Sequence, residues 1–277
     1  MTGSKRPAFF AAFDDGGTVT PASNPQFAIA WDDTTNGAAN RDIFRRTYGT
    51  DAAPVAPAPS LVIAAGEAGA QSVPGLAFDR VNDLFLTAWA HDDGAGIRDI
   101  RGVRLNESYT VLGAAFDLST TANPAVDVPV AVAHSAGSQV WLVVWQDNQA
   151  TDVIFARTVS AGGVVGAADI TVSDAPAGSG ENLTPTVAWD AANDQFLVLW
   201  SQFNAAATQS TIRGRFVSAT GVALGASGFN VSAATAAVRL SPAITFNPVS
   251  QRYIAAWTEQ ATAASARADV FGRGIQS

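Results

Sequence analysis

Polar side chains recur two residues after a regularly spaced tryptophan, and their types suit hydrogen bonding to a hydroxylated ligand. The five positions are Asp33, His91, Asp147, Gln202 and Glu259. Carboxylates and amides bind pairs of sugar hydroxyls, and an aromatic ring can cover the apolar face of a sugar. We therefore take these five residues as the candidate ligand-binding positions. The alternative is that each one bonds the backbone of its own turn, as polar residues at strand ends commonly do.

Acidic residues beside the first two of these positions offer oxygen ligands for a metal ion. Asp32 precedes Asp33, and Asp92 and Asp93 follow His91. Ca²⁺ is bound by such carboxylates together with backbone carbonyls. These three neighbouring aspartates are therefore candidate Ca²⁺ ligands, although no EF-hand pattern surrounds them. No other cofactor is predicted.

A catalytic arrangement is harder to find in the sequence than a binding one. No Ser-His-Asp arrangement, phosphate-binding loop or dinucleotide-binding motif occurs. Hydrolysis of a glycosidic bond needs two carboxyl groups roughly 5–10 Å apart at one end of the molecule. The pairs that come closest are Asp14/Asp15, Asp32/Asp33 and Asp92/Asp93. Because the sequence does not place these carboxyl groups in space, it favours a protein that is not an enzyme, and no catalytic residue is predicted.

Composition narrows the classes of partner. The formal net charge is −8, and Lys5 is the one lysine of the chain, whereas binding to a nucleic-acid backbone needs clustered Lys and Arg. The lack of cysteine excludes disulfides and thiolate catalysis. No segment approaches the roughly 20 apolar residues of a membrane span. The short apolar stretch 7–13 runs straight into acidic residues, so we interpret it as a strand and not as a signal peptide.

The elements that position these residues follow from an internal repeat. An aromatic residue stands four places before a tryptophan in Phe27/Trp31, Phe85/Trp89, Trp141/Trp145, Phe196/Trp200 and Tyr253/Trp257. A period of this size indicates a repeat architecture. We predict one domain over residues 1–277, made of units at about 7–68, 69–123, 124–178, 179–235 and 236–277.

Each unit is predicted to contain four short strands, with the aromatic motif on the second. That strand is apolar on both faces, as in Phe196, Val198 and Trp200 on one side and Leu197 and Leu199 on the other. A strand that is apolar on both faces is covered on both sides.

Sheets stacked face to face satisfy that condition, so the fold class is all-β, a five-bladed β-propeller of four-stranded antiparallel blades. No fourth strand is predicted after Val270–Ile275, so the last blade has three strands or is completed by residues outside this chain. An open solenoid is the rival architecture.

The aromatic-x-x-x-Trp motif followed by Asp-Ile-x-Gly, as in Phe85–Trp89 with Asp99–Gly102, resembles the tandem propeller repeats of bacterial secreted and cell-surface proteins. The resemblance implies an extracellular or cell-surface location. Five-bladed propellers include lectins of the tachylectin-2 kind and glycosidases of the arabinanase and invertase kind. Neither signature is matched residue by residue, so no catalytic residue is carried over.

Three functions remain open from the sequence. The leading hypothesis is a non-catalytic module that recognises a glycan or another surface ligand, in the manner of a lectin, through the residues after the motif tryptophans. The alternatives are a polysaccharide-active glycoside hydrolase or lyase, and a structural or protein-docking propeller of a larger surface protein. Neither a nucleic-acid partner nor a membrane span is predicted, and the sequence leaves the oligomeric state open.

Overall fold

The protein is all-β within the part of the chain that its computed structural model describes. The described residues are 5–14, 26–34, 41–49, 53, 61–63, 68–94, 98–106, 110–120, 129–148, 152–174, 180–265 and 267–277. Among them no helix is long and apolar enough to span a membrane. The predicted unit boundaries at 123–124 and 178–179 lie outside the described residues.

The strands form five antiparallel sheets, each built from consecutive strands, which we call blades one to five. In chain order they are β1 (Lys5–Asp14), β2 (Gln26–Asp33), β3 (Asp42–Gly49) and β4 (Leu61–Val62); β5 (Ala70–Asp79), β6 (Leu84–Asp92), β7 (Arg98–Asn106) and β8 (Val111–Asp117); β9 (Ala131–Ser135), β10 (Val140–Asn148), β11 (Asp152–Ser160) and β12 (Ile170–Thr171); β13 (Asn182–Asp190), β14 (Gln195–Phe203), β15 (Ser210–Ser218) and β16 (Phe229–Asn230); β17 (Val238–Asn247), β18 (Arg252–Gln260) and β19 (Asp269–Gln276).

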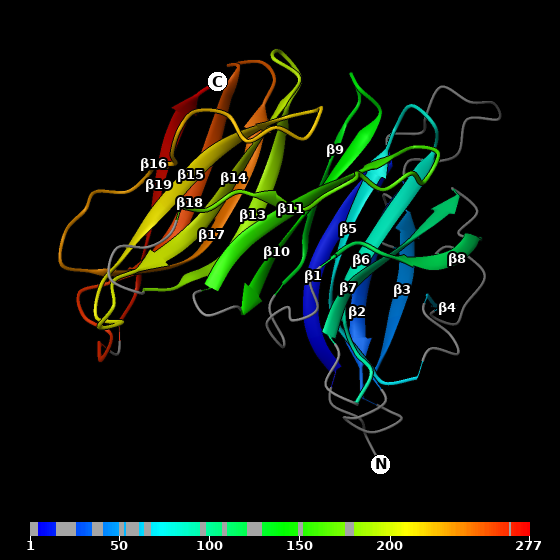
Figure 1. Ribbon diagram of the computed structural model, residues 1–277, viewed down its shortest axis with the longest axis horizontal. Helices are drawn as coiled ribbons and strands as arrows, with labels where there is room; N and C mark the ends of the chain where they lie inside the picture. Colours follow the sequence, from blue (N-terminus) through cyan, green and yellow to red (C-terminus); the bar gives the residue numbers. More distant parts are fainter. Residues whose placement is uncertain are drawn as a thin grey trace.

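Neighbouring blades contact each other through their first strands. The strands β1, β5, β9, β13 and β17 contact one another in chain order, and Figure 1 shows the N-terminal blades on the right and the C-terminal blades on the left. The fold is a five-bladed β-propeller, as predicted, and the last blade has three strands among the described residues. The rival solenoid is wrong, because the strands pair antiparallel and inside their own blade.

Pairs of aromatic rings lie across the hairpin formed by the first two strands of a blade. The ring expected at the end of the first strand lies directly opposite the first aromatic residue of the motif. The ring centroids are 4.7 Å apart in Phe78/Phe85, 5.1 Å in His134/Trp141 and 5.0 Å in Phe246/Tyr253. Tilted and edge-on ring pairs of this kind contribute beyond the apolar area they bury, so they help to set the hairpin register.

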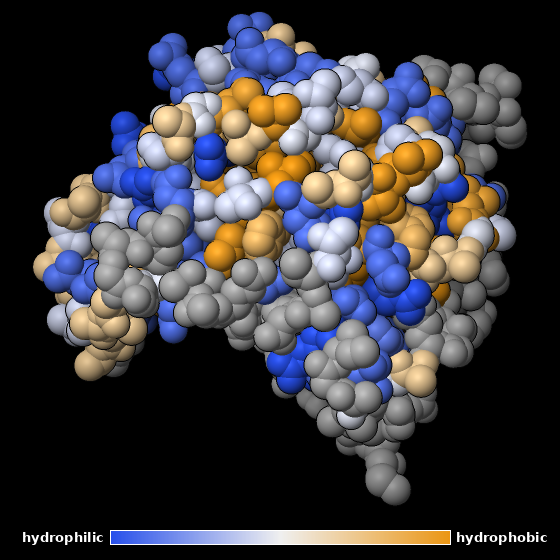
Figure 2. Space-filling view, viewed as in Figure 1, coloured by the Kyte–Doolittle hydropathy of each residue, from blue (hydrophilic) through white to orange (hydrophobic). Residues whose placement is uncertain are grey.

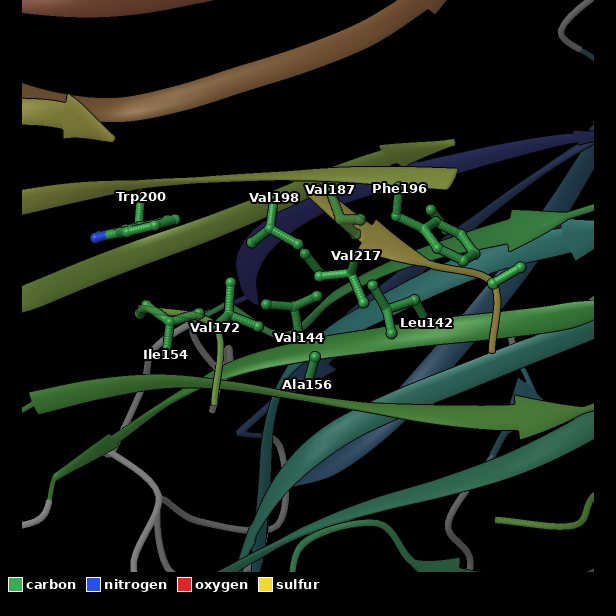
Figure 3. Packing of buried hydrophobic residues seen from close by; sticks show 13 residues of the cluster. Leu142, Val144, Ile154, Ala156, Val172, Val187, Phe196, Val198, Trp200 and Val217 are labelled. Carbon is green, nitrogen blue, oxygen red and sulfur yellow. The ribbon is translucent and has the colours of Figure 1, made fainter. Parts of the chain in front are cut away.

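The second strand of a blade is buried on both faces, as β14 shows. Phe196, Val198 and Trp200 pack against blade three, where Figure 3 shows them over residues that include Leu142, Val144 and Ile154. Leu197 and Leu199 pack in the opposite direction, against blade five. Burial of each such side chain contributes about 1.5–3 kcal/mol. The expectation of a strand covered on both sides is confirmed.

The motif tryptophans belong to the packing between blades. Trp89, Trp145 and Trp200 expose 1% of their surface or less, and Trp257 exposes 7%. Apolar side chains also gather in the middle of the face drawn in Figure 2, with polar ones toward its edges. Four of the five tryptophans that mark the repeat are therefore core residues, while Trp31 is half-buried.

The outer strand of blade two is longer than those of blades one, three and four. It begins at Val111 and ends at Asp117. A register irregularity between Gly102 and Arg104 lets β8 pair with β7 over a longer stretch. Elsewhere the fourth strand is two residues long.

The turns at the end of the first strands are formed as expected. A side-chain oxygen accepts a hydrogen bond from the backbone N–H two residues later in Asp79–Val81 (2.9 Å), Asp190–Ala192 (2.7 Å) and Asn247–Val249 (2.9 Å). These residues form turns at the end of the propeller opposite to the candidate binding residues.

The burial of one repeated position in the third strand predicts how far truncation to alanine lowers the free energy of unfolding. Ile154 is fully buried, whereas Val270, at the same position of the fifth unit, is 76% exposed. Ile154→Ala should lower the free energy of unfolding by about 2–5 kcal/mol, because it leaves a cavity. Val270→Ala should change it by less than about 0.5 kcal/mol. Urea unfolding of both variants checks this, and equal losses would contradict the packing described.

Candidate functional site

The five candidate ligand-binding residues lie at one end of the propeller, which we call the mouth. Each lies near the C-terminal end of the second strand of its blade, and four of them face the start of the first strand: Asp33 opposite Lys5, His91 opposite Gln71, Gln202 opposite Asn182, and Glu259 opposite Arg239. The second strand continues past the tryptophan, because the first strand still pairs with it there.

These five residues are buried or half-buried at the contacts between blades, which we call seams, and do not lie on an open surface. Asp33, His91 and Asp147 expose 8% of their surface or less, while Gln202 and Glu259 are half-buried. Each lies two residues after its tryptophan, so it points to the same side of the strand. The fold thus brings the five to one mouth but into different seams, and their role in ligand binding stays a prediction.

Two of the five are already paired inside their own blade. Gln202 Nε2 donates to Asn182 Oδ1 at 3.1 Å, and Trp200 Nε1 donates to the same oxygen at 2.8 Å. Glu259 accepts hydrogen bonds from Arg239 at 2.8 and 3.2 Å. Sequence reasoning missed Asn182 and Arg239, which alignment of the two strands of each hairpin would have placed opposite the candidates.

The carboxylates considered for Ca²⁺ have arginine partners in two cases. Asp92 Oδ2 accepts from Arg98 Nε at 3.0 Å, and the Gly94 N–H and Arg98 together lower the pKa of Asp92. The buried Asp32 lies 3.5 Å from Arg41 Nη1. Among the described residues no three acidic or histidine side chains gather as metal ligands. Ca²⁺ binding at Asp32, Asp92 or Asp93 stays a prediction.

A pair of acidic residues that sequence reasoning missed lies at the mouth, between blades three and four. Asp152 begins β11, and Glu181 directly precedes β13. The buried Asn182 ties the two segments together, because its Nδ2 donates to the backbone oxygens of Asp152 at 2.9 Å and of Asp174 at 3.2 Å. The fold therefore holds Glu181 beside Asp152.

The two carboxyl groups of this pair differ in environment. Burial raises the pKa of Asp152, and the negative charge of Glu181 raises it further, against the opposing effect of a hydrogen bond with Gln146. The Glu181 side chain is exposed. Carboxyl groups whose environments differ in this way can divide the roles of acid and base between them.

The acids at these two positions differ from the counterparts that can be compared in other units. Two residues before the buried third-strand position, where blade three has Asp152, the other units have Arg41, Arg98, Ser210 and Ala268. The position of Glu181 is taken by Ala70 in blade two and Val238 in blade five. A unit-by-unit alignment would have revealed the difference, but attention to the residues after the tryptophans did not.

A polar groove of about 240 Å³ lies at the mouth end of blade four, and neither Asp152 nor Glu181 lines it. Its walls include Gln202, Asn204, Gln209, Ser210 and Thr235, and every residue that lines it is uncharged. Phe203, which also lines it, donates its backbone N–H to the carbonyl oxygen of Glu181 at 2.7 Å. Amides and hydroxyls so arranged can bind the hydroxyls of a sugar chain beside Glu181.

No protein-family model matches the chain, and no curated protein matches it. Solved structures share its fold. It aligns with the alpha-L-arabinanase of Penicillium chrysogenum complexed with arabinobiose at a TM-score of 0.56 and 13% identity, over 100% of this chain and 86% of that chain. An N-acetylgalactosamine deacetylase from F. plautii in complex with blood group B trisaccharide aligns at 0.55 and 7% identity, over 94% and 83%. The Hadza microbial sialidase Hz136 aligns at 0.57 and 11%, over 96% and 56%.

These comparisons correct one expectation. The sequence favoured a protein that is not an enzyme, whereas the similar propellers are an arabinanase, a deacetylase and a sialidase. The preference for a non-catalytic module is contradicted by this finding and is not kept. The residues near the motif tryptophans carry no catalytic pattern, and the acidic residues Asp152 and Glu181 come together only through the packing of two blades.

The pKa of Asp152 predicts how stability changes with pH. A carboxyl group whose pKa is raised on folding destabilises the folded chain once it ionises, and this cost is absent at pH values below the unfolded pKa. Asp152→Asn removes the cost. The variant should therefore gain stability over the wild type as pH rises from about 3.5 to 7, measured by urea unfolding.

Asp92→Asn is the matched control and should behave in the opposite sense. The pKa of Asp92 is lowered on folding, so its contribution is present above the unfolded pKa and disappears as pH falls. This variant should lose stability relative to the wild type at pH 7 and approach it at low pH. The same pH dependence in both variants would contradict the environments described.

Proposed function

We propose that the chain is a glycoside hydrolase whose acid–base pair is Asp152 and Glu181 at the mouth, between blades three and four. The observation that carries the proposal is the meeting of a half-buried and an exposed carboxyl group at one seam, with an uncharged polar groove at the same end of the neighbouring blade. The fold shared with the arabinanase supports it. The proposal departs from the lectin-like hypothesis by assigning a reaction.

The roles follow from the two environments. Asp152, whose pKa is raised by burial and by its acidic neighbour, donates a proton to the oxygen of the leaving sugar. The carboxylate of Glu181 then activates a water molecule or attacks the anomeric carbon itself. Carboxyl groups about 6.5–9.5 Å apart lead to inversion of configuration, and groups about 5–5.5 Å apart lead to retention. The anomer released in the reaction distinguishes the two routes.

The groove favours a neutral substrate. Gln202, Asn204, Gln209 and Thr235 present amides and hydroxyls, which match the hydroxyls of a neutral sugar. A carboxylate-bearing sugar is better matched by arginine. We therefore place arabinan and other neutral polysaccharides ahead of sialylated glycans as substrates.

The reaction is tested by turnover of a panel that contains arabinan oligosaccharides, N-acetylgalactosamine-terminated glycans and sialylated glycans. Asp152→Asn and Glu181→Gln should each lower kcat by about 10²–10⁴-fold, the usual contribution of a general acid or base. In addition, the alkaline limb of the rate profile should vanish in Asp152→Asn, because that limb reports ionisation of the acid.

Asp99→Asn is the matched control. Burial raises the pKa of Asp99 as well, followed by the charge of Asp117, but Asp99 belongs to blade two. This variant should keep wild-type turnover. Loss of activity in Asp99→Asn with full activity in Asp152→Asn would overturn the assignment, and so would a wild-type protein that cleaves nothing in the panel.

A further inference from the structure

A buried amide lies beside Asp152, on the neighbouring strand of blade three. Gln146 exposes 5% of its surface and comes directly after Trp145, the motif tryptophan of β10. In the register of the hairpin, Gln146 lies opposite Ile154, two residues from Asp152 on β11. Side chains two residues apart on a strand point to the same face, and the face that carries Ile154 packs against blade four. Gln146 and Asp152 therefore meet at the seam between blades three and four.

The same two positions are in contact in blade one. There they hold Asp32 and Arg41, whose side chains lie 3.5 Å apart. Contact between these positions is thus a property of the repeated hairpin, and blade three uses it to bond Gln146 to Asp152. The other units have no amide at the position of Gln146, where they carry Asp32, Ala90, Ser201 and Thr258.

A bulge in the first strand of blade four determines how the Gln146 amide is oriented. The pairing of β13 with β14 shifts between Leu183 and Thr186, and Thr184 has a φ of 51° immediately before Pro185. A bulge leaves a residue unpaired with the neighbouring strand, so the Thr184 N–H stands outside the regular ladder. It donates instead to Gln146 Oε1, at 3.4 Å.

With its oxygen bonded to Thr184, Gln146 offers its NH₂ group to the carboxylate of Asp152. An ionised carboxylate only accepts hydrogen bonds, and the nitrogen is the donor of a side-chain amide. A hydrogen bond to the charged form of a carboxyl group lowers its pKa. The bond from Gln146 accordingly opposes the rise in the pKa of Asp152 that burial and Glu181 cause.

Two other acidic residues lie near this seam, and they differ in their partners. Glu181 raises the pKa of Asp152 by its negative charge. Asp174, which follows the fourth strand of blade three, pairs its carboxylate with Arg213 at 2.7 Å. Glu181 is therefore the charge that acts on Asp152 from blade four, and Gln146 is the polar group that acts on it from blade three.

We propose that Gln146 is a positioning residue that holds the carboxyl group of Asp152 toward the bulge at Thr184, three residues after Glu181. In this way it fixes the acid of blade three relative to the carboxyl group of blade four. The role of Asp152 as the acid rests on the proposed function, whereas the contact between Gln146 and Asp152 is a property of the fold.

The contact is tested by NMR on the wild-type chain. The side-chain amide resonances of Gln146 should titrate together with the carboxyl carbon of Asp152, and this response should vanish in Asp152→Asn. Amide resonances of Gln146 that do not follow the ionisation of Asp152 would overturn the proposal. The measurement needs no turnover, so it is independent of the proposed hydrolase activity.

Gln146→Met keeps a similar volume and removes both hydrogen bonds. The pKa of Asp152 should rise, because burial and Glu181 are then unopposed, and the alkaline limb of the rate profile should move to higher pH. Since misplacement of a catalytic group by about 1 Å can cost about 10²-fold, kcat should fall by up to that factor with KM unchanged. A loss of stability with an unchanged pKa of Asp152 would show a merely structural role and overturn the proposal.

Gln139→Met is the matched control. Gln139 immediately precedes β10, at the opposite end of that strand from Gln146, and its Oε1 accepts a hydrogen bond from Asn82 Nδ2 at 3.3 Å. This variant should keep the wild-type pKa of Asp152, and a rise equal to that in Gln146→Met would overturn the proposal. A wild-type chain that cleaves no glycan, while Gln146→Met still raises the pKa of Asp152, would overturn the proposed function and support the placement of Asp152 by Gln146.

Discussion

The stacking of apolar sheet faces is the interaction on which the rest of this structure depends. A single blade is too thin to bury its own side chains, so each blade is stable only between its neighbours. β14 shows the principle, because Trp200 on one face and Leu199 on the other are both fully buried, against different blades. The aromatic residues repeat along the sequence because each blade needs them for this packing.

The same stacking decides where chemistry can occur. Polar groups at the ends of the seams leave water on folding and need partners. Gln202 and Glu259 find theirs across the hairpin, in Asn182 and Arg239. Asp152 is different, because the acidic residue whose charge helps to raise its pKa, Glu181, belongs to another blade. A seam that brings like charges together costs stability, and such costs are typical of sites that act on a ligand.

Stacking also explains the exposed face of blade five. The isoleucines at the repeated third-strand position of blades one to four pack against the second strand of the blade that follows. Blades one to four also carry a fourth strand, held by a backbone hydrogen bond and, in blades two to four, by a serine hydroxyl. Among the described residues Val270 of blade five has neither cover and is 76% exposed.

The sequence by itself determined the five units, the order of their strands and the ring pairs such as Phe78 with Phe85, because these depend on local periodicity and on hairpins between neighbouring segments. It also placed Asp33, His91 and Asp147 at one end of the molecule. Only the tertiary structure decided that these residues are buried in seams, that Asn182 joins Asp152 to Glu181, and that Val270 is uncovered. Those relations arise between segments about 20 to 30 residues apart or more, across blades, where contacts depend on packing in three dimensions and leave no local pattern in the chain.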